Sequence, residues 1–375
     1  MLIRTAAACV LLLAMAACGP DRENRPEARA PSSPLGSAQA ATAPSGPVTL
    51  PPRELQADLA QLGRNFPGDV GIAVKDLSGH WVAAWNPRPS FPQQSSMKIW
   101  LGVAVLDAVD RGELALNDTI LLQPADLSIH HQPIKGAVLD DGSHIATVEE
   151  LLRLAISRSD NAATDALIRR LGGTESVEAV LARKGFGALR IGPEERVLHT
   201  RLAGLTWRPD YVYPQVFDRE RQAVPYAQRE ALLEAYAQQP MDGATPPAIV
   251  SGLEALKEGR LLSPASTERL LLDMTESRTG RSRLKAGVEP GWTVAHKTGT
   301  GPDLDAITYG YNDVGLLTAP DGRVYAVAAM IGKTQASIRE RQIFLSNVSR
   351  AIVEHWKRTH GPDSSVARGE AKLPA

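Results

Sequence analysis

Residues 95–98 read SSMK, within the longer stretch SFPQQSSMKIWLGVAVLDAVDRGEL at positions 90–114. Pro92 stands just ahead, and apolar residues recur at helical spacing after it, which predicts a helix that begins near Ser95. Residues three apart lie on one face of a helix, so Lys98 can point back toward the Ser95 hydroxyl. A serine needs such a base to act as a nucleophile, and burial or a second cation nearby would keep the lysine neutral enough to serve. Taken alone, the pair also fits a solvated helix start.

A second polar group occurs in SRSDNAATDAL, where Ser159, Asp160 and Asn161 precede a helical pattern. From a loop, the Ser159 hydroxyl and the Asn161 carboxamide can both face a cleft, one to relay a proton and the other to bind an amide of a substrate. The alternative is a helix N-cap, because Ser, Asp and Asn are the residues preferred there.

A third group lies in WTVAHKTGTGP, near the end of a predicted strand. Lys297, Thr298 and Thr300 offer a cation and two hydroxyls, which suit a carboxylate. Gly299 permits a ligand to approach the backbone closely. The alternative is an exposed edge strand that carries a lysine as protection against aggregation.

Together, S-x-x-K, S-D-N and K-T-G in this order resemble the signature of class A β-lactamases and penicillin-binding proteins. The stretch RTGRSRLKAGVEPGWTVAHKTGTG is also similar to the class A approach to its KTG strand. The resemblance extends over about residues 53–357, nearly the whole predicted folded unit.

The resemblance implies a role for each residue. Ser95 would attack the lactam carbonyl, Lys98 would take part in removing its proton, and Ser159 would pass a proton to the leaving nitrogen. Asn161 would hold the side-chain amide of the substrate, and the backbone N–H groups of Ser95 and Thr300 would form the oxyanion hole. The substrate carboxylate would bind to the third group, namely Lys297, Thr298, Gly299 and Thr300.

Release of the acyl-enzyme needs a water activated by a general base, which class A enzymes supply from an E-x-x-L-N segment. The sequence ERVLH at 195–199 lies at a similar interval after the SDN group, so we expect Glu195 to be this base, with Glu194 as a second candidate. His199 stands in place of the Asn that supports the water, and an imidazole can also donate or accept a hydrogen bond. The alternative for Glu195 is a surface carboxylate paired with Arg190 or Arg196.

Two aromatic features lie near the predicted cleft. The segment after Glu195 is longer than usual in class A, and its aromatic residues either shape a lid or pack the segment onto the body; they are Trp207, Tyr211, Tyr213 and Phe217. His130 and His131 do not predict a metal site, since adjacent side chains diverge and no third ligand accompanies them. The resemblance places them in a loop at the cleft edge, and we expect neither a metal nor a cofactor.

The surrounding elements predict a serine hydrolase domain at residues 51–358. Helical spacing marks residues 53–66, two strands flank a turn at Ser78-Gly79, three more strands follow residue 290, and a last helix runs from about 338 to 356. We therefore predict an α+β fold with an antiparallel sheet built from both chain ends and flanking helices. An all-helical subdomain at about 92–285 is inserted, with the active site between the two parts.

The N-terminal stretch MLIRTAAACVLLLAMAACGP resembles a bacterial lipoprotein signal that ends at a lipidated Cys18. We predict a signal peptide and lipobox at 1–18, a disordered Pro/Ala/Ser tether at 19–50 and a flexible tail at 359–375. The domain would then be anchored on the periplasmic face of a bacterial membrane. An ordinary secretory signal, which would leave it soluble in the periplasm, is the alternative.

Composition narrows the function further. The net charge of −1 and the absence of a long Lys/Arg run argue against nucleic acid as a partner, and we expect a monomer. The main hypothesis is a class A-like serine β-lactamase whose partner is a small β-lactam. The alternatives are a penicillin-binding or peptidase-like serine hydrolase acting on cell-wall peptides, and a non-hydrolytic penicillin-binding lipoprotein.

Overall fold

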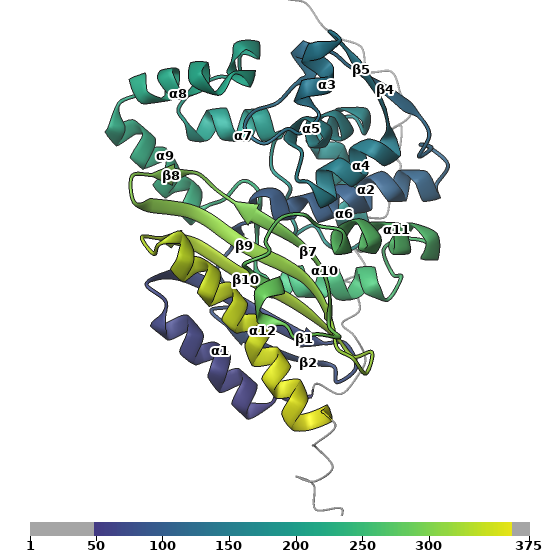
Figure 1. Ribbon diagram of the computed structural model, residues 1–375, viewed down its shortest axis with the longest axis vertical. Helices are drawn as coiled ribbons and strands as arrows, with labels where there is room; N and C mark the ends of the chain where they lie inside the picture. Colours follow the sequence, from purple (N-terminus) through teal and green to yellow (C-terminus); the bar gives the residue numbers. More distant parts are fainter. Residues whose placement is uncertain (1–48, 362–375) are drawn as a thin grey trace, which may run out of the picture. The chain divides into compact units, whose positions relative to one another are not determined.

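The computed structural model describes residues 49–361 (Figure 1). Cys18, the predicted signal peptide and nearly all of the predicted tether and tail lie outside this range, so these stay predictions. Within residues 49–361, no helix combines the length and apolarity that a bilayer span requires.

A six-stranded antiparallel sheet runs through the protein in the order β2-β1-β10-β9-β7, and β8 pairs with β9 at one end. Strands from before the helical part (β1, β2) and from after it (β7 to β10) lie in this one sheet, so the predicted α+β fold with a sheet from both chain ends is confirmed. The bounds are β1 Gly68–Asp76, β2 Trp81–Trp85, β7 Thr293–Thr300, β8 Asp303–Leu304, β9 Ile307–Thr318 and β10 Val324–Thr334.

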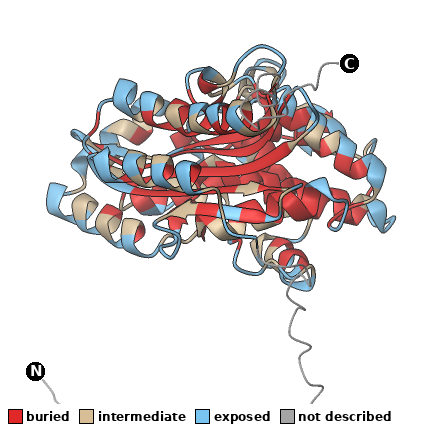
Figure 2. Cartoon of the chain, turned by 90° about the horizontal axis from the view of Figure 1, so that it is seen from below, coloured by how far each residue is buried: buried red, intermediate tan, exposed pale blue. Residues whose placement is uncertain are grey.

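Both faces of the sheet are covered by helices. Helices α1 (Arg53–Asn65) and α12 (Ile338–His360) lie side by side on one face, and the helical part covers the other (Figure 1). In β10, Val327 and Ala329 pack into the α1/α12 core, whereas Ala328 packs into the core of the helical part. A strand buried on both faces has a nearly continuous apolar sequence, as VYAVAAMIG does, and Figure 2 shows these strands as buried between exposed outer helix turns.

The inserted part is mostly helical, but the prediction that it is all-helical is wrong. It contains two small sheets, β3 (Phe91–Pro92) with β6 (Gly243–Ala244), and β4 (Thr119–Leu122) with β5 (His144–Thr147). Strands of two to four residues are too short to show an alternating pattern. The helices are α2 Lys98–Asp110, α3 Lys135–Asp140, α4 Val148–Ser157, α5 Asn161–Arg170, α6 Thr174–Arg183, α7 Glu195–Leu202, α8 Pro214–Ala223, α9 Tyr226–Gln238, α10 Pro246–Lys257 and α11 Pro264–Thr275, with 3-10 turns η1 Gln94–Met97, η2 Pro124–Asp126, η3 Pro209–Val212 and η4 Leu284–Gly287.

The predicted helix at 53–66 and the predicted hairpin around Ser78-Gly79 are confirmed as α1 and β1–β2. The last helix continues to His360, past the predicted end near residue 356, so residues 359 and 360 are helical and not part of a loose tail.

Candidate active site

Ser95 lies in the 3-10 turn η1, half-buried, directly before helix α2. The residue before it, Gln94, has a left-handed backbone (φ 52°), which costs energy for a residue other than glycine. Such strain persists only where the surroundings enforce it, and it is typical of functional turns.

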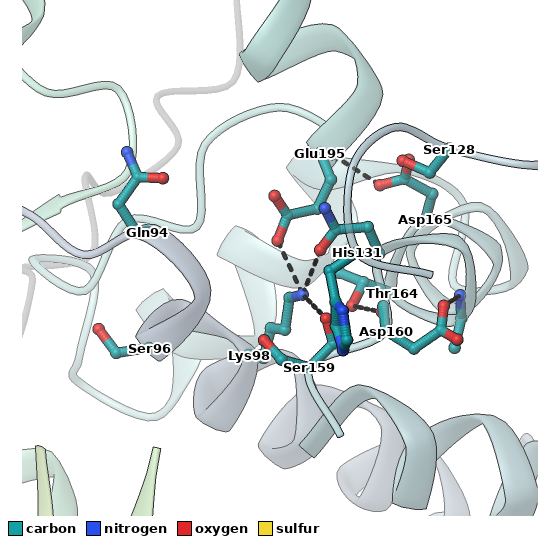
Figure 3. Close-up of polar contacts among 12 residues, drawn as sticks. Gln94, Ser96, Lys98, Ser128, His131, Ser159, Asp160, Thr164, Asp165 and Glu195 are labelled. Atoms are coloured by element: carbon teal, nitrogen blue, oxygen red, sulfur yellow. Dashed lines mark hydrogen bonds and ion pairs between the residues drawn. The ribbon is translucent and has the colours of Figure 1, made fainter. Parts of the chain in front are cut away.

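Lys98, the first residue of α2, is fully buried. Helix α2 is apolar on all sides and buried from Lys98 to Ala108, so its start lies inside the protein and not at a solvated surface. The Lys98 Nζ donates to Asn161 Oδ1 (2.6 Å) and to the Ser159 carbonyl (3.0 Å) (Figure 3). It also lies 3.0 Å from Glu195 Oε1.

The SDN group both caps a helix and lines the cleft, the two positions that its sequence suggested. Asp160 caps α5, because its carboxylate accepts from the Ala163 N–H (2.9 Å), and it also accepts from the Ile134 N–H (2.7 Å). Ser159, with a left-handed φ of 60°, and Asn161 both line the cleft together with Ser95.

The KTG group lies on β7, an edge strand, yet Lys297 is fully buried. Its Nζ donates to Ser159 Oγ (2.8 Å) and to the Thr298 carbonyl (3.1 Å). Burial lowers the pKa of Lys297 well below its usual value, and the Lys98 ammonium lowers it further. The alternative interpretation, an exposed edge-strand lysine that protects against aggregation, is therefore wrong for Lys297.

A glycine is needed at position 299 because the backbone of β7 passes very close to the backbone at Gln93. A Cβ at this position would lie 2.2 Å from the Gln93 carbonyl oxygen, a distance that no side chain can occupy. The glycine therefore lets the KTG strand lie against the turn that carries Ser95.

Arg283 is a site residue that the sequence analysis missed. It is buried, and it donates to the carbonyls of Gly299 (2.8 Å) and Asn312 (2.6 Å) and to Thr300 Oγ1 (2.6 Å). Its guanidinium also stacks over the Tyr311 ring at 3.7 Å. A second cation thus stands at the KTG end of the cleft, and only its tertiary contacts distinguish it from the neighbouring arginines of RTGRSR.

Glu195 is the first residue of α7 and is 2% exposed. Its Oε2 lies 3.1 Å from His199 Nε2, and its Oε1 contacts Lys98 without the angles of a hydrogen bond. Burial opposes ionisation of this carboxyl, but the Lys98 ammonium and the His199 contact outweigh it and hold the pKa of Glu195 well below its usual value.

The alternative for Glu195, a surface carboxylate paired with arginine, is wrong. Arg190 pairs with Glu178 (2.8 Å) and Arg196 pairs with Glu194 (2.9 Å). Glu194, the second candidate for the base, also pairs with Arg169 (2.8 Å), so its carboxylate is already occupied by two cations.

Asp165 on α5 holds the start of α7 in place. No motif in the sequence predicted this residue as part of the site. Its carboxylate accepts from the N–H groups of Glu195 (2.6 Å) and Arg196 (3.2 Å) and from Ser128 Oγ (2.6 Å) (Figure 3). Burial raises the pKa of Asp165 to about 7. Two of the four N–H groups that lack an intrahelical partner at the start of α7 are thus satisfied from a neighbouring helix.

A cavity of about 560 Å³ lies between Ser95, the SDN group and the KTG group. This volume is within the usual range of small-molecule binding sites. It is lined by the nucleophile, by residues of the second and third groups, and by the segment after Glu195. Its polar lining around the nucleophile comprises Ser95, Ser159, Asn161, His199, Thr298, Thr300 and Arg283.

Comparison with known proteins places this site in a family. The sequence matches the Beta-lactamase enzyme family over residues 54–356. The chain belongs to this family. It is 27% identical over 288 residues to the beta-lactamase VEB-1 of Pseudomonas aeruginosa, an alignment that covers 76% of this chain and 85% of the relative.

Solved structures agree with the assignment. A beta-lactamase from Chitinophaga pinensis superposes with a TM-score of 0.66 at 26% identity, over 80% of this chain and 98% of the other. A mutant of the class A beta-lactamase of the last common ancestor of Gram-negative bacteria superposes with a TM-score of 0.65 at 29% identity, over 82% of this chain and 100% of the other. The resemblance to class A enzymes is therefore confirmed.

Within this β-lactamase family member, the segment from α7 to β6 is held to the nucleophile by a buried carboxyl. Asp242 accepts from the Gln94 N–H (2.6 Å) and from the Tyr236 hydroxyl (2.8 Å), and Gln94 Nε2 donates back to Tyr236. Burial raises the pKa of Asp242 to about 6. This ring of contacts fixes the strained residue before Ser95, and no local pattern in the sequence indicated it.

The aromatic residues of the segment mainly pack it onto the body. Tyr211 and Phe217 are buried and form one cluster with Ile129, although Phe217 also lines the cavity. His130 packs edge-on against the rings of His199 (4.7 Å) and Phe217 (5.3 Å). Both predicted cleft-edge histidines, His130 and His131, line the cavity, and within residues 49–361 no three metal-binding side chains gather around a common point.

Proposed function

We propose that this chain is a class A-like serine β-lactamase that hydrolyses β-lactams through an acyl-enzyme on Ser95. The observation that carries the proposal is the position of Lys98, whose Nζ contacts the Ser159 carbonyl, Asn161 and Glu195 inside the same site. Membership of the β-lactamase family and the cavity around Ser95 support it.

In the acylation step, Ser95 Oγ attacks the lactam carbonyl carbon and its proton passes to Lys98. Transfer of a proton from Lys98 to Glu195, across their 3.0 Å contact, leaves the neutral amine that this step requires. The C–N bond of the ring then breaks, and Ser159 gives its proton to the nitrogen. Ser159 regains a proton from Lys98, which lies against it, and Glu195 returns its proton to Lys98 across their contact. Lys297 orients the Ser159 hydroxyl through its hydrogen bond to Oγ and keeps its own proton.

The substrate carboxylate binds at the KTG end of the cleft. Thr298 and Thr300 offer hydroxyls, and Arg283 donates to Thr300 from behind, so the positive charge of Arg283 and Lys297 favours an anion there. The N–H groups of Ser95 and Thr300 stabilise the oxyanion, and Asn161 holds the amide of the substrate's side chain.

In the deacylation step, Glu195 takes a proton from a water that attacks the acyl carbon, and the bond between that carbon and Ser95 Oγ breaks. The Oγ takes a proton from Lys98, and Glu195 passes the proton of the water on to Lys98 across their contact. His199 Nε2, 3.1 Å from Glu195 Oε2, supports the orientation of the carboxylate. The low pKa keeps Glu195 ionised at neutral pH, so its carboxylate carries no proton when the water binds.

Hydrolysis of a chromogenic cephalosporin tests the proposal. We expect steady turnover by the wild-type protein and loss of at least 1000-fold in Ser95→Ala, since the covalent route is then closed, by analogy with other activated nucleophiles. A single stoichiometric burst followed by silence would favour a penicillin-binding protein instead.

We also propose that Cys18 carries a lipid that anchors the enzyme at the periplasmic face of a bacterial membrane, on the basis of the lipobox-like sequence MAAC. Fractionation of cells that express Cys18→Ser should move the protein from the membrane to the soluble fraction. Unchanged fractionation would contradict lipidation.

A further inference from the structure

The cavity extends beyond the motif residues to α7, α8, α9 and β8, and we call this part of it the second compartment. Its apolar lining consists of Leu202, Ala203, Phe217, Leu233, Pro302 and Leu304. Two arginines, Arg221 near the end of α8 and Arg229 in the first turn of α9, also line it. Neither arginine belongs to the three motifs or to the deacylation group.

Most donors of these two arginines are unused. The Arg221 Nε is buried without a hydrogen-bond partner among residues 49–361. The one carboxylate of these residues that the Arg221 guanidinium contacts is Asp218, and the distance from Nη2 to Oδ1 is long at 3.4 Å. Charge-assisted hydrogen bonds are normally 2.7–2.9 Å. Arg229 donates from Nε to the Val224 carbonyl (3.2 Å), and no carboxylate of residues 49–361 lies within 4.0 Å of its guanidinium nitrogens.

The acidic residues of this compartment do not cancel the charge. Asp303 accepts from Thr308 and lies 3.9 Å from Arg341, so it already has a cation of its own. Asp218 makes only the long contact with Arg221. The two arginines beside the apolar wall therefore face one aspartate that is shared with Arg341 and one that makes only a long contact, so neither guanidinium is fully neutralised.

This charge is separate from the cations at the KTG end. Lys297 and Arg283 belong to β7 and the turn before it, whereas Arg221 and Arg229 belong to the helical segment after Glu195. Burial lowers the pKa of His130 to about 3, and the positive charge of Arg221 contributes to this shift. His130 also packs on His199. In the proposed reaction, the carboxylate common to β-lactams binds to the cations at the KTG end. The arginines of the second compartment are therefore free to bind a different part of the substrate.

We propose that Arg221 and Arg229 form a subsite for an anionic group on the side chain of the substrate, so that this enzyme favours β-lactams with a carboxylate in the side chain. The inference rests on the proposed β-lactamase function. The apolar wall contacts the body of the side chain, and the guanidinium groups bind its carboxylate.

Two penicillins that differ by one carboxylate test the proposal: benzylpenicillin, and carbenicillin, its α-carboxy derivative. The quantity measured is the ratio of kcat/KM for carbenicillin to kcat/KM for benzylpenicillin. In the double variant Arg221→Gln/Arg229→Gln this ratio should fall by roughly 10-fold or more, the effect of losing hydrogen bonds to a charged group. Any general loss of folded protein affects both substrates equally and cancels in the ratio.

Arg219→Gln is the matched control, because Arg219 lies on the same helix, is exposed and pairs only with Glu220. It should leave the ratio within twofold of wild type. Added salt should lower the ratio in the wild type but not in the double variant, because it screens the exposed part of the interaction. A ratio unchanged in the double variant overturns the subsite, whereas failure of both penicillins to acylate wild-type Ser95 overturns the proposed function and the subsite with it.

Discussion

Two walls of the cleft bury ionisable side chains of opposite kinds. The wall built by α2 and β7 buries two lysines, Lys98 and Lys297, and the wall built by the segment from α7 to β6 buries two carboxyls, Glu195 and Asp242. The pKa of Glu195 is held low, whereas burial raises that of Asp242 to about 6.

The pKa values of the two carboxyls differ because their hydrogen-bond and ion-pair partners differ. Glu195 contacts the Lys98 ammonium, while Asp242 contacts only neutral donors, the Gln94 N–H and the Tyr236 hydroxyl. Burial alone disfavours a charged carboxyl, and a nearby cation reverses the effect. One carboxyl is thus prepared to accept a proton in catalysis, and the other holds the nucleophile turn.

Breaking the cross-cleft ion pair should have the largest effect. Lys98→Met keeps the length of the side chain but leaves Glu195 as a buried carboxylate without its ammonium partner, which should cost about 3–5 kcal/mol of folding stability and abolish acylation. Urea unfolding and mass spectrometry of the acyl adduct measure the two effects. The double variant Lys98→Met/Glu195→Gln should recover much of the stability, and equal destabilisation in both would contradict the ion-pair account.

Asp165 tests whether the start of α7 must be fixed for Glu195 to work. Asp165→Ala removes the acceptor of the Glu195 and Arg196 N–H groups, so we expect a loss of about 1–3 kcal/mol in stability and a deacylation rate lowered by roughly 10-fold or more. Ser128→Ala removes only the hydroxyl that donates to Asp165 and should have a smaller effect. Deacylation at the wild-type rate in Asp165→Ala would show that this support is dispensable.

Asp242 predicts a pH dependence of stability with a defined sign. Its folded pKa of about 6 exceeds the unfolded value, so its contribution is fully present below pH 4 and is lost as the pH rises through 6. Relative to the wild type, Asp242→Asn should gain stability between pH 4 and pH 7, by up to roughly 3 kcal/mol. Denaturant unfolding at several pH values measures this difference, and parallel stability curves would contradict it.

The smallest effect is expected at Glu194, next to the proposed base. Its carboxylate pairs with Arg169 and Arg196 on the outside of the segment, and such partly exposed pairs contribute about 0–1 kcal/mol. Glu194→Gln should therefore change the deacylation rate less than threefold. A loss as large as that of Glu195→Gln would transfer the role of base to Glu194.

The sequence predicted those features that depend on neighbouring residues, namely helices and strands with periodic apolar residues, and short motifs. The apolar runs of β1, β7 and β10 and the spacing of α1 indicated the sheet and its cover, and three short motifs indicated the site. Arg283, Asp165 and Asp242 remained unpredicted because their function arises from contacts with residues 16 to 148 positions away, which leave no trace in neighbouring residues. The small sheets β3–β6 and β4–β5 escaped because their strands are too short.

The central claim is that Lys98 serves the acylation of Ser95 and Glu195 serves deacylation. Mass spectrometry of Glu195→Gln after mixing with benzylpenicillin tests it most directly. A stable acyl adduct on the peptide that contains Ser95, together with turnover slowed by at least 1000-fold, is the result expected when attack remains and the water has lost its base. Turnover at the wild-type rate, or a protein that never becomes acylated, would contradict the account.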